Sequence, residues 1–574
     1  MGMLASIGQF IQRARFGTSH VALSSGGRAY DAAQYDSREM GGWVPPLTAG
    51  IDENLNSRDM VTRRARDLVR NHPIISGASD RRAEAVVGPN VRLEAMPAFE
   101  IMGQTPDWAD AWALQVEQQF ELWARDPRKL CDAEQQLQFG GMVELAYRHW
   151  WNDGECAAVI KMLPPRGPRV MAQWETCIEI VDPDRISNPQ GKPDNYPMGN
   201  GNTLIGGIEY NSYKAPVAAW IRVVHPASIQ AGATGNFTWK RIPYYGPTGR
   251  PIFVHAFKRN RADQRRGISR FVAAIKRIKM FDRYDDAEIE AALLAAVMAF
   301  SVESPEPTAD VAAALAPTSS SDTEANYLNE RMQYRMNKPV RIDGVRVIHT
   351  LPGEELKQHR AEHPSSNYPE FQATGLRAIS AALGLSYAQV SQNWADINYS
   401  SARAMLNEIW RGLLHDRWLF TQAFCTPIYL AWMEEGAAKG FVPMPGRKKD
   451  FYKWRNALSL CEWMGPGRGT VDPLKEGQAN EYFHNMGVID ASSIANEQGR
   501  SLDKTLFKQS REARAREKYG LEPYAALKGS GSSGSDGADG AGDASGTEAD
   551  RGGDGKPNEE QAKGAKGRKE PAKA

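Results

Sequence analysis

Three short stretches of the chain carry residue types that could do chemistry, and the first resembles a metal site. His359, Glu362 and His363 lie in "HRAEH", which has the H-x-x-E-H spacing of inverted zinc proteases. That chemistry needs both histidines on one helical face, but Pro364 follows directly and disfavours helix at His363. A metal-dependent hydrolase at these residues is therefore the alternative hypothesis, and it predicts stoichiometric zinc.

The second stretch is "NYSSARAMLNEIWR", in which two adjacent serines precede an arginine. A serine nucleophile needs a base held by a third group, and the next histidine, His415, lies far inside the expected helix. A helix start needs Ser or Thr at its N-cap, followed by good helix formers. We therefore interpret Ser400 or Ser401 as a helix cap, with Arg403 in the first turn.

The third stretch, "VDPDR", brings Asp182 and Asp184 together around Pro183. Proline between the two carboxylates indicates a turn, and Asp182 is predicted to cap it. The chain contains neither a GxxxxGK[ST] phosphate-binding loop nor a GxSxG nucleophile elbow. The sequence therefore predicts no catalytic residues, no metal and no cofactor.

Composition favours a large globular protein. The 574 residues suggest two to four folded units, and 41% of them are hydrophobic. Lys and Arg number 70 against 69 Asp and Glu, so the overall charge does not indicate a surface that grips nucleic acid everywhere. Five cysteines without a CxxC pair make a disulfide framework or a thiolate zinc site improbable and fit a reducing cytoplasm.

Both ends of the chain differ from the middle. Residues 1–27 begin "MGMLAS", a match to the myristoylation pattern, but we interpret them as a short amphipathic arm. Residues 529–574 lack aromatic, Leu, Ile, Val and Met side chains, which predicts a disordered tail. No run of eighteen apolar residues occurs, so no membrane partner is expected.

Helical and strand patterns alternate in the first half, which predicts an α+β, predominantly helical fold. Amphipathic patterns predict helices over 59–72, 78–87 and 107–125, the last with an apolar stripe of Trp108, Trp112, Val116, Phe120 and Trp123. Short apolar runs predict strands in an antiparallel or mixed sheet packed by these helices; they cover 156–163, 177–186, 206–211, 218–226 and 251–257.

Longer helices dominate the second half. One unbroken helix is expected over 267–300, about 50 Å long, with basic residues early and acidic residues late. This order opposes the helix dipole, so charges outside the helix must compensate for it. "RIDGVRV" predicts a hairpin at Asp343–Gly344. A second helix from Pro369 ends at Gly384, and after a loop a third runs to about Gly440.

An ordered series of short motifs carries a family resemblance. The chain reads, in order, "YDAA", "RARDLVRNHP", "VVGPNVRL", "DGE" (153–155), "VDPDRI", "GIEY", "VVHP", "VHAFKRNRADQRRGIS", "AEIEAALLAA", "LPGEE", "AALGLSYAQVS" and "NYSSARAMLNEIWR". Over about residues 28–500 this series resembles the portal proteins of tailed bacteriophages, in their lambda-like family. The extra Ala/Pro/Ser-rich segment 303–321 and the C-terminal tail depart from the family pattern.

The resemblance implies a non-enzymatic homo-oligomer, a ring of twelve chains at one capsid vertex of the virion, assembled in the bacterial host cytoplasm. The ring would be the conduit for double-stranded DNA during genome packaging, head–tail joining and ejection. The implied partners are the terminase large subunit as a separate motor, a head-completion or adaptor protein, and the major capsid and scaffolding proteins. A monomeric scaffold or adaptor that uses the charged tail is the remaining alternative.

The family regions map onto the chain by position. The resemblance implies an arm (1–27), a wing (28–266), a first stem helix (267–300), a clip (301–362), a second stem helix (363–384), a tunnel loop (385–399), a long wing helix (400–440), a C-terminal helical crown (441–528) and a tail (529–574). In the tunnel loop we hypothesise that Gln392, Asn393, Trp394 and Asn398 face passing DNA. The alternative for Trp394 is packing against a neighbouring helix.

Overall fold

The computed structural model describes residues 42–164, 173–228, 237–297, 300–303, 355–358, 368–395, 398–447, 450–469 and 472–521. The chain divides into one large unit that ends at Leu502 and a second that begins at Asp503. Several predictions lie outside the described residues: the arm, the hairpin at Asp343–Gly344, the "HRAEH" motif and the tail.

A three-stranded antiparallel sheet lies at the centre of the large unit. Strand β2 (Glu155–Met162) pairs with β3 (Thr176–Val181) on one side and with β9 (Phe253–Phe257) on the other. Side chains alternate along β2: Cys156, Ala158 and Ile160 join the helical core, whereas Ala157 and Val159 join a second core. Both faces of the sheet are therefore covered, which explains the continuous apolar run in β2.

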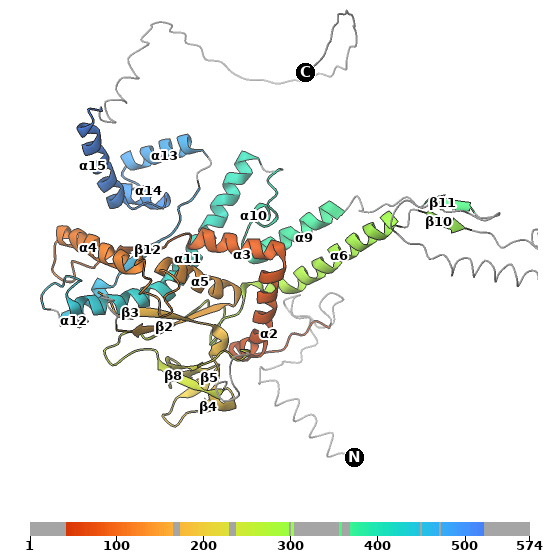
Figure 1. Ribbon diagram of the computed structural model, residues 1–574, viewed down its shortest axis with the longest axis horizontal. Coiled ribbons are helices and arrows are strands. Elements are labelled where there is room, and N and C mark those ends of the chain that lie inside the picture. The colour runs from red at the N-terminus through yellow and green to blue at the C-terminus, as the bar shows by residue number, and fades with distance from the viewer. Residues whose placement is uncertain are drawn as a thin grey trace, which may run out of the picture. The chain divides into compact units, whose positions relative to one another are not determined.

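Helices cover one face of this sheet (Figure 1). They are α3 (Pro73–Val86), α4 (Pro106–Ala124), α5 (Phe139–Asn152) and the long α11 (Tyr399–Lys439), whereas α2 (Gly50–Asn71) contributes residues to both cores. The predicted apolar core face of α4 is confirmed: Trp112, Val116, Phe120 and Trp123 are buried, and Trp108 is partly buried. Phe120 contacts Trp432 of α11 edge-to-face, with ring centroids 5.2 Å apart.

A second, five-stranded antiparallel sheet covers the other face. Its order is β4–β5–β6–β7–β8, with bounds Tyr196–Pro197, Thr203–Ile205, Ile208–Tyr210, Pro216–Arg222 and Trp239–Pro243. Turns of 3-10 helix, η2 (Pro183–Arg185) and η3 (Pro189–Gly191), connect β3 to this sheet. Asp182 is the N-cap of η2, as predicted, and its side chain accepts from the backbone N–H of Asp184 at 2.9 Å.

Among the remaining elements, two helices run side by side away from the sheets (Figure 1). These two are α6 (Ile275–Val297) and α9 (Tyr368–Leu383), and beyond them β10 (Phe300–Glu303) pairs antiparallel with β11 (Glu355–Gln358). The other elements are β1 (Arg92–Ala95) paired with β12 (Cys461–Met464), η5 (Arg270–Ala273), α10 (Tyr387–Ser391), α12 (Phe451–Leu458), α13 (Pro473–Asn485), α14 (Ala491–Glu497) and α15 (Leu502–Lys518).

The prediction of one unbroken helix over 267–300 was wrong at its start and at its end, where Phe300 belongs to β10. Ser269 caps the 3-10 turn η5 by accepting from the Phe271 N–H, and α6 begins only at Ile275. Gly267 precedes this turn, and its N–H donates to the buried carboxylate of Glu155 at 2.8 Å. Helix α6 is therefore about 35 Å long rather than 50 Å.

Within the described ranges, no helix combines the length and apolar character that crossing a membrane requires.

Candidate functional site

A buried carboxylate, Glu155 at the start of β2, fixes the point from which α6 departs. It accepts from Arg58 Nη2 at 2.7 Å and from Arg266 Nε at 2.9 Å, and His255 Nε2 lies 3.0 Å from its Oε2. Burial favours the neutral acid, but Arg266 and Arg58 outweigh it and hold the pKa of Glu155 well below its usual value. The two arginines and the carboxylate thus join α2, β2 and the segment that leads into α6.

The other two residues of the "DGE" motif, Asp153 and Gly154, belong to the same junction. Gly154 has a φ of +94°, and a Cβ there would overlap the backbone of Ile268. Asp153 accepts from Arg66 Nε and Nη2, each at 2.8 Å, which fastens α2 to the end of α5. The motif quoted from the sequence is therefore a structural joint beneath the projecting helices.

Aromatic side chains and one glycine hold α6 against α9. Phe281 and Phe371 stack with ring centroids 5.9 Å apart, and Tyr284 lies 4.7 Å from Phe371. Gly375 of α9 is buried directly over Phe281, where an added Cβ would overlap the ring. The close approach of the two helices therefore depends on the missing side chain at position 375.

Replacing Gly375 with Ala is expected to destabilise the protein by about 1–3 kcal/mol, because the methyl group forces Phe281 out of its place. The matched control is Gly412→Ala in α11, where no atom lies within 4 Å of the new Cβ. That change is expected to stabilise by up to about 1 kcal/mol through helix propensity. Urea unfolding at one protein concentration measures both, and equal effects would contradict the packing role of Gly375.

Part of the unfavourable charge order of α6 is compensated within the chain. His72, at the junction of α2 and α3, places Nε2 2.9 Å from Asp282 Oδ1. The Tyr368 hydroxyl of α9 donates to Asp285 at 3.1 Å. Burial, together with Asp282 and Asp286, still raises the pKa of Asp285. Asp282 thus has a partner at the α2–α3 junction, and Asp285 has one on α9.

After α9, the chain enters the segment 385–399 in which the candidate DNA contacts lie. The expected continuous loop is corrected by α10, because Ser386 and Gln389 form a capping box that starts this short helix. Gln392 then takes a left-handed conformation with φ +58° and ends α10. Between α10 and α11, the described residues 392–395 and 398 belong to no helix or strand, and Gln392, Asn393 and Trp394 are exposed there, Trp394 by 48%.

The amide groups in this loop have distinct local roles. Asn393 Oδ1 accepts from the Ala395 N–H at 3.0 Å, and Asn398 Oδ1 accepts from the Ser401 N–H at 2.9 Å. Gln392 instead donates its Nε2 to the Gln389 carbonyl at 2.9 Å. Both asparagines therefore direct their oxygen to the backbone, which leaves the Nδ2 donors as the groups that can reach an acceptor outside.

Asn398, rather than Ser400 or Ser401, is the N-cap of α11. The helix begins at Tyr399, so the two serines fall in its first turn, and Ser401 Oγ donates to the Asn398 carbonyl at 2.9 Å. Asn is as good an N-cap as Ser, and it precedes the two serines by two and three positions. Because the helix starts earlier than expected, Arg403 is its fifth residue and lies just beyond the first turn, where it is exposed.

A buried ion pair that the sequence did not reveal anchors α11 under this loop. Arg82 of α3 donates to Asp416 of α11 and to the Gly384 carbonyl, the latter at 3.0 Å. Lys258 Nζ lies 3.1 Å from the other oxygen of Asp416. Burial opposes ionisation of Asp416, but Arg82 and Lys258 lower its pKa. The end of α9, and with it the start of the loop, is thereby tied to α11.

Arg417, the next residue, makes a different kind of contact. Its Nε donates to the Val86 carbonyl at 2.8 Å, and its Nη2 donates to the carbonyls of Ala85 at 3.0 Å and Pro466 at 3.1 Å. Burial lowers the pKa of Arg417 to about 10. The guanidinium therefore satisfies the last carbonyls of α3, which have no partner within that helix.

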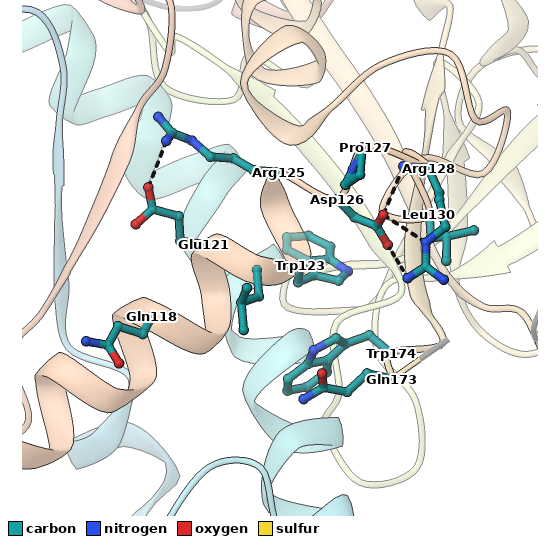
Figure 2. Close-up of a pocket in the computed structure, with 11 residues that line it drawn as sticks. Gln118, Glu121, Trp123, Arg125, Asp126, Pro127, Arg128, Leu130, Gln173 and Trp174 are labelled. Atoms are coloured by element: carbon teal, nitrogen blue, oxygen red, sulfur yellow. Dashed lines mark hydrogen bonds and ion pairs between the residues drawn. The ribbon is translucent and has the colours of Figure 1, made fainter. Parts of the chain in front are cut away.

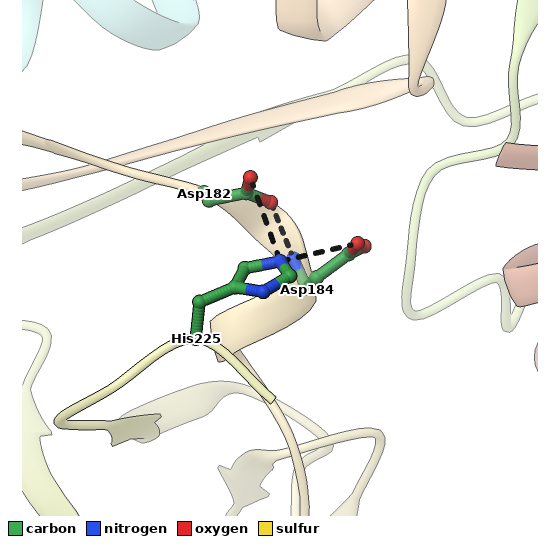
Figure 3. Close-up of side chains that lie close together, drawn as sticks. All are labelled: Asp182, Asp184 and His225. Atoms are coloured by element: carbon green, nitrogen blue, oxygen red, sulfur yellow. Dashed lines mark hydrogen bonds and ion pairs between the residues drawn. The ribbon is translucent and has the colours of Figure 1, made fainter. Parts of the chain in front are cut away.

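One cluster has the composition of a cation site: Asp182, Asp184 and His225 (Figure 3). His225 Nε2 lies 3.9 Å from Asp182 Oδ2 and 3.7 Å from Asp184 Oδ2. Arg66, however, donates to Asp182 at 3.0 Å and to Asp184 at 2.8 Å. The guanidinium supplies the positive charge that a cation would bring, so the cluster is organised as a salt bridge.

A hollow with a volume of about 720 Å³ lies between the C-terminal end of α4 and Trp174 (Figure 2). Trp123 and Trp174 form apolar parts of its lining. Its charges pair with each other: Arg125 with Glu121, and Arg128 with Asp126, each at 2.9 Å. Since these charges pair at the rim, the hollow presents no convergent set of groups for acid–base or nucleophilic chemistry.

Comparison with known proteins points in one direction. The family model described as "Phage portal protein, lambda family" matches residues 36–417. The portal protein of Escherichia phage N15 is 27% identical over 502 residues, 85% of this chain and 90% of the relative. Portal protein B of Escherichia phage lambda is 28% identical over 496 residues, 84% of this chain and 89% of the relative.

Among solved structures, a chain from the neck of a native GTA particle, computed with C12 symmetry, aligns with 82% of this chain and 94% of its own length. Its sequence identity is 14% and its TM-score is 0.37.

Proposed function

This chain belongs to the lambda family of phage portal proteins, and from that premise we propose that its copies assemble into a closed ring at one vertex of the capsid, a conduit for double-stranded DNA. A subunit number of twelve is part of the proposal. The ring would serve genome packaging by a separate terminase motor, head–tail joining and ejection, without enzymatic activity of its own.

The observation that carries this proposal is the projecting pair α6 and α9. The two helices leave the sheets side by side, and α6 exposes large apolar side chains that nothing in the described chain covers: Met280 by 62%, Ile289 by 57% and Leu293 by 61%. Exposed apolar groups on a projecting rod indicate burial against other molecules. Copies arranged side by side around an axis would cover them, and a heterologous contact whose rotation closes gives a ring.

The regions of such a ring follow the order of the chain. We assign the wing to the helices and two sheets up to residue 266, the stem to α6 and α9, and the clip to the segment that includes β10 and β11. Terminase and the head-completion protein would bind at the clip, and capsid and scaffolding proteins at the wing. The crown would comprise residues 441–528.

The loop 392–398 is proposed to face the DNA. The Nδ2 donors of Asn393 and Asn398 can each bond a phosphate oxygen, and Trp394 offers an exposed ring beside them. Neutral amides bond phosphate without the counterion release that makes Lys and Arg contacts tight. Such contacts would resist slippage of DNA while still letting it pass.

Replacing Asn393 and Asn398 together with Asp tests this role of the loop. Asp keeps the oxygen that caps α11 and is equally good at an N-cap, so folding should be unchanged. It also removes both donors and adds two negative charges per chain, which repel phosphate. Heads built with this variant are expected to lose packaged DNA several-fold faster, measured as the DNA retained after the motor is removed.

The control is Asn56→Asp on the exposed side of α2, which adds negative charge away from the loop. Unchanged retention in the double loop variant would refute the DNA contacts and leave the ring itself untouched. Substitution of residues 392–395 by Gly and Ser provides a second test, and DNA that does not slip in that variant would refute them as well.

The ring is tested by native mass spectrometry and negative-stain imaging of the full chain. Particles of about a dozen chains around a central hole are the expected result. A monomer with one bound zinc would instead favour the hydrolase hypothesis at His359, Glu362 and His363. A monomer without metal would favour a scaffold or adaptor.

A further inference from the structure

Helix α4 has an exposed face opposite the one it buries. Positions 107, 111, 114, 118 and 122 follow at intervals of three or four residues and form one stripe. The stripe is acidic at its start, where Asp107 and Asp110 are exposed, and apolar later, where Leu114 is 42% and Leu122 63% exposed. We call these residues the α4 stripe.

The first half of α11 has an exposed face with the opposite charge. Positions 403, 407, 411, 414 and 418 again follow at intervals of three or four residues. Arg403 and Arg411 are exposed in its first part, and Leu414 is 43% and Trp418 59% exposed in its second part. These residues form the α11 stripe.

The two stripes match in length and in order. Asp107 to Leu122 and Arg403 to Trp418 each cover sixteen residues, with about 22 Å of helix between the first and the last. If the helices run parallel, the acidic start of one meets the basic start of the other, and the apolar residues meet further along. Position 118 then lies opposite position 414.

The stripes cannot meet within one chain. The buried face of α4 already packs on the second half of α11, where Phe120 contacts Tyr429 and Trp432. The α4 stripe is on the far side of α4 from that contact, and the α11 stripe lies more than ten residues before it along α11. A second copy of the chain, however, offers a stripe with the complementary charge and the same spacing.

We propose that the α11 stripe of one subunit packs parallel on the α4 stripe of the next. This contact joins two different surfaces of the same chain, so it is heterologous and can close around an axis. It rests on the ring of the proposed function and names a contact that holds neighbouring subunits together, with ion pairs at one end and Leu and Trp side chains at the other.

Cysteine cross-linking in the full chain tests the register. Gln118→Cys combined with Leu414→Cys is expected to give a ladder of disulfide-linked multimers after oxidation, because facing positions bring the Cα atoms within about 7 Å. Gln115→Cys combined with Leu414→Cys is the matched control, since Gln115 is exposed on α4 beside the stripe. If the protein forms rings, equal ladders for the two pairs would overturn the register. The absence of a ladder for Gln118→Cys with Leu414→Cys would overturn it as well.

Charge reversal tests the contact itself. Asp107→Arg with Asp110→Arg, or Arg403→Asp with Arg411→Asp, is expected to reduce the fraction of chains in rings at least tenfold at low salt. Combining all four changes should restore most of the assembly, with native mass spectrometry as the readout and circular dichroism confirming that each variant is folded.

Two negative outcomes are distinguishable. If the unmodified chain forms rings and the reversed variants form them equally well, the stripe contact is wrong and the ring stands. If the unmodified chain stays monomeric at every concentration tested, both the proposed ring and the proposed contact are refuted.

Discussion

Replacing Glu155 with Gln is expected to lower the free energy of unfolding by about 3–5 kcal/mol, because it leaves buried guanidinium groups without a counter-charge. Arg266 is fully buried and Arg58 nearly so, and both donate to this carboxylate. The amide keeps the shape of the side chain but provides a single acceptor oxygen. Urea unfolding of the full chain at a fixed protein concentration measures the loss.

The matched control is Asp59→Asn, since Asp59 accepts from the same Arg58 at 2.9 Å but is 73% exposed. An exposed pair contributes less than about 1 kcal/mol, so this change should have a small effect. Equal losses at the two positions would contradict the role assigned to burial.

The pH dependence gives a second readout. The pKa of Glu155 is lower in the folded chain than in the unfolded chain, where it is about 4.3. The contribution of the Glu155 carboxylate to the free energy of unfolding is therefore present above pH 4.3 and is lost as pH falls through the folded pKa. Gln does not titrate, so the stability difference between wild type and variant should narrow in that acidic range.

The second large effect is expected for Arg82→Met, at about 3–5 kcal/mol, because Asp416 loses its buried partner. The same change removes the bond to the Gly384 carbonyl, so amide hydrogen exchange should also accelerate over 385–391. The loop that follows would then lose its fixed starting point, which connects a change in α3 to the proposed DNA contacts.

Lys258→Met separates the two consequences. Lys258 pairs with the same carboxylate at 3.1 Å but is 27% exposed and makes no contact to Gly384. A loss of about 1 kcal/mol with unchanged exchange over 385–391 is expected. Faster exchange in this variant would show that the charge on Asp416, rather than the Arg82 bond, positions the loop.

The sequence predicted those elements whose limits are set locally. His72 before Pro73 ends α2, Gly384 ends α9 and Gly440 ends α11, and each signal acts through the backbone of its own residue. The three strands of the central sheet were also predicted, since their apolar runs are continuous. Two strands of the second sheet, β6 and β7, were predicted over 206–211 and 218–226, but their place in a separate sheet on the far face was not, because apolar runs do not reveal which strands pair.

The failures arose where distant segments override a local pattern. The residues after Gly267 have good helical periodicity, yet the close approach of Gly154 to Gly267 and Ile268 delays the helix to Ile275. Likewise, the charges of Arg82 and Asp416 are visible in the sequence, but their pairing across 334 positions is not. The N-cap of α11 was predicted at Ser400 or Ser401 instead of Asn398, because Asn and Ser have similar N-cap propensities.

The spacing of the Glu155 contacts also sets an order of events during synthesis. Its partners Arg58 and Arg266 lie 97 and 111 positions away on either side of it. As the chain emerges from the ribosome, the carboxylate stays hydrated until residue 266 is available, and such non-local contacts make folding slow. Because α6 begins nine positions after residue 266, the contacts that fix its base become available just before the helix itself is synthesised.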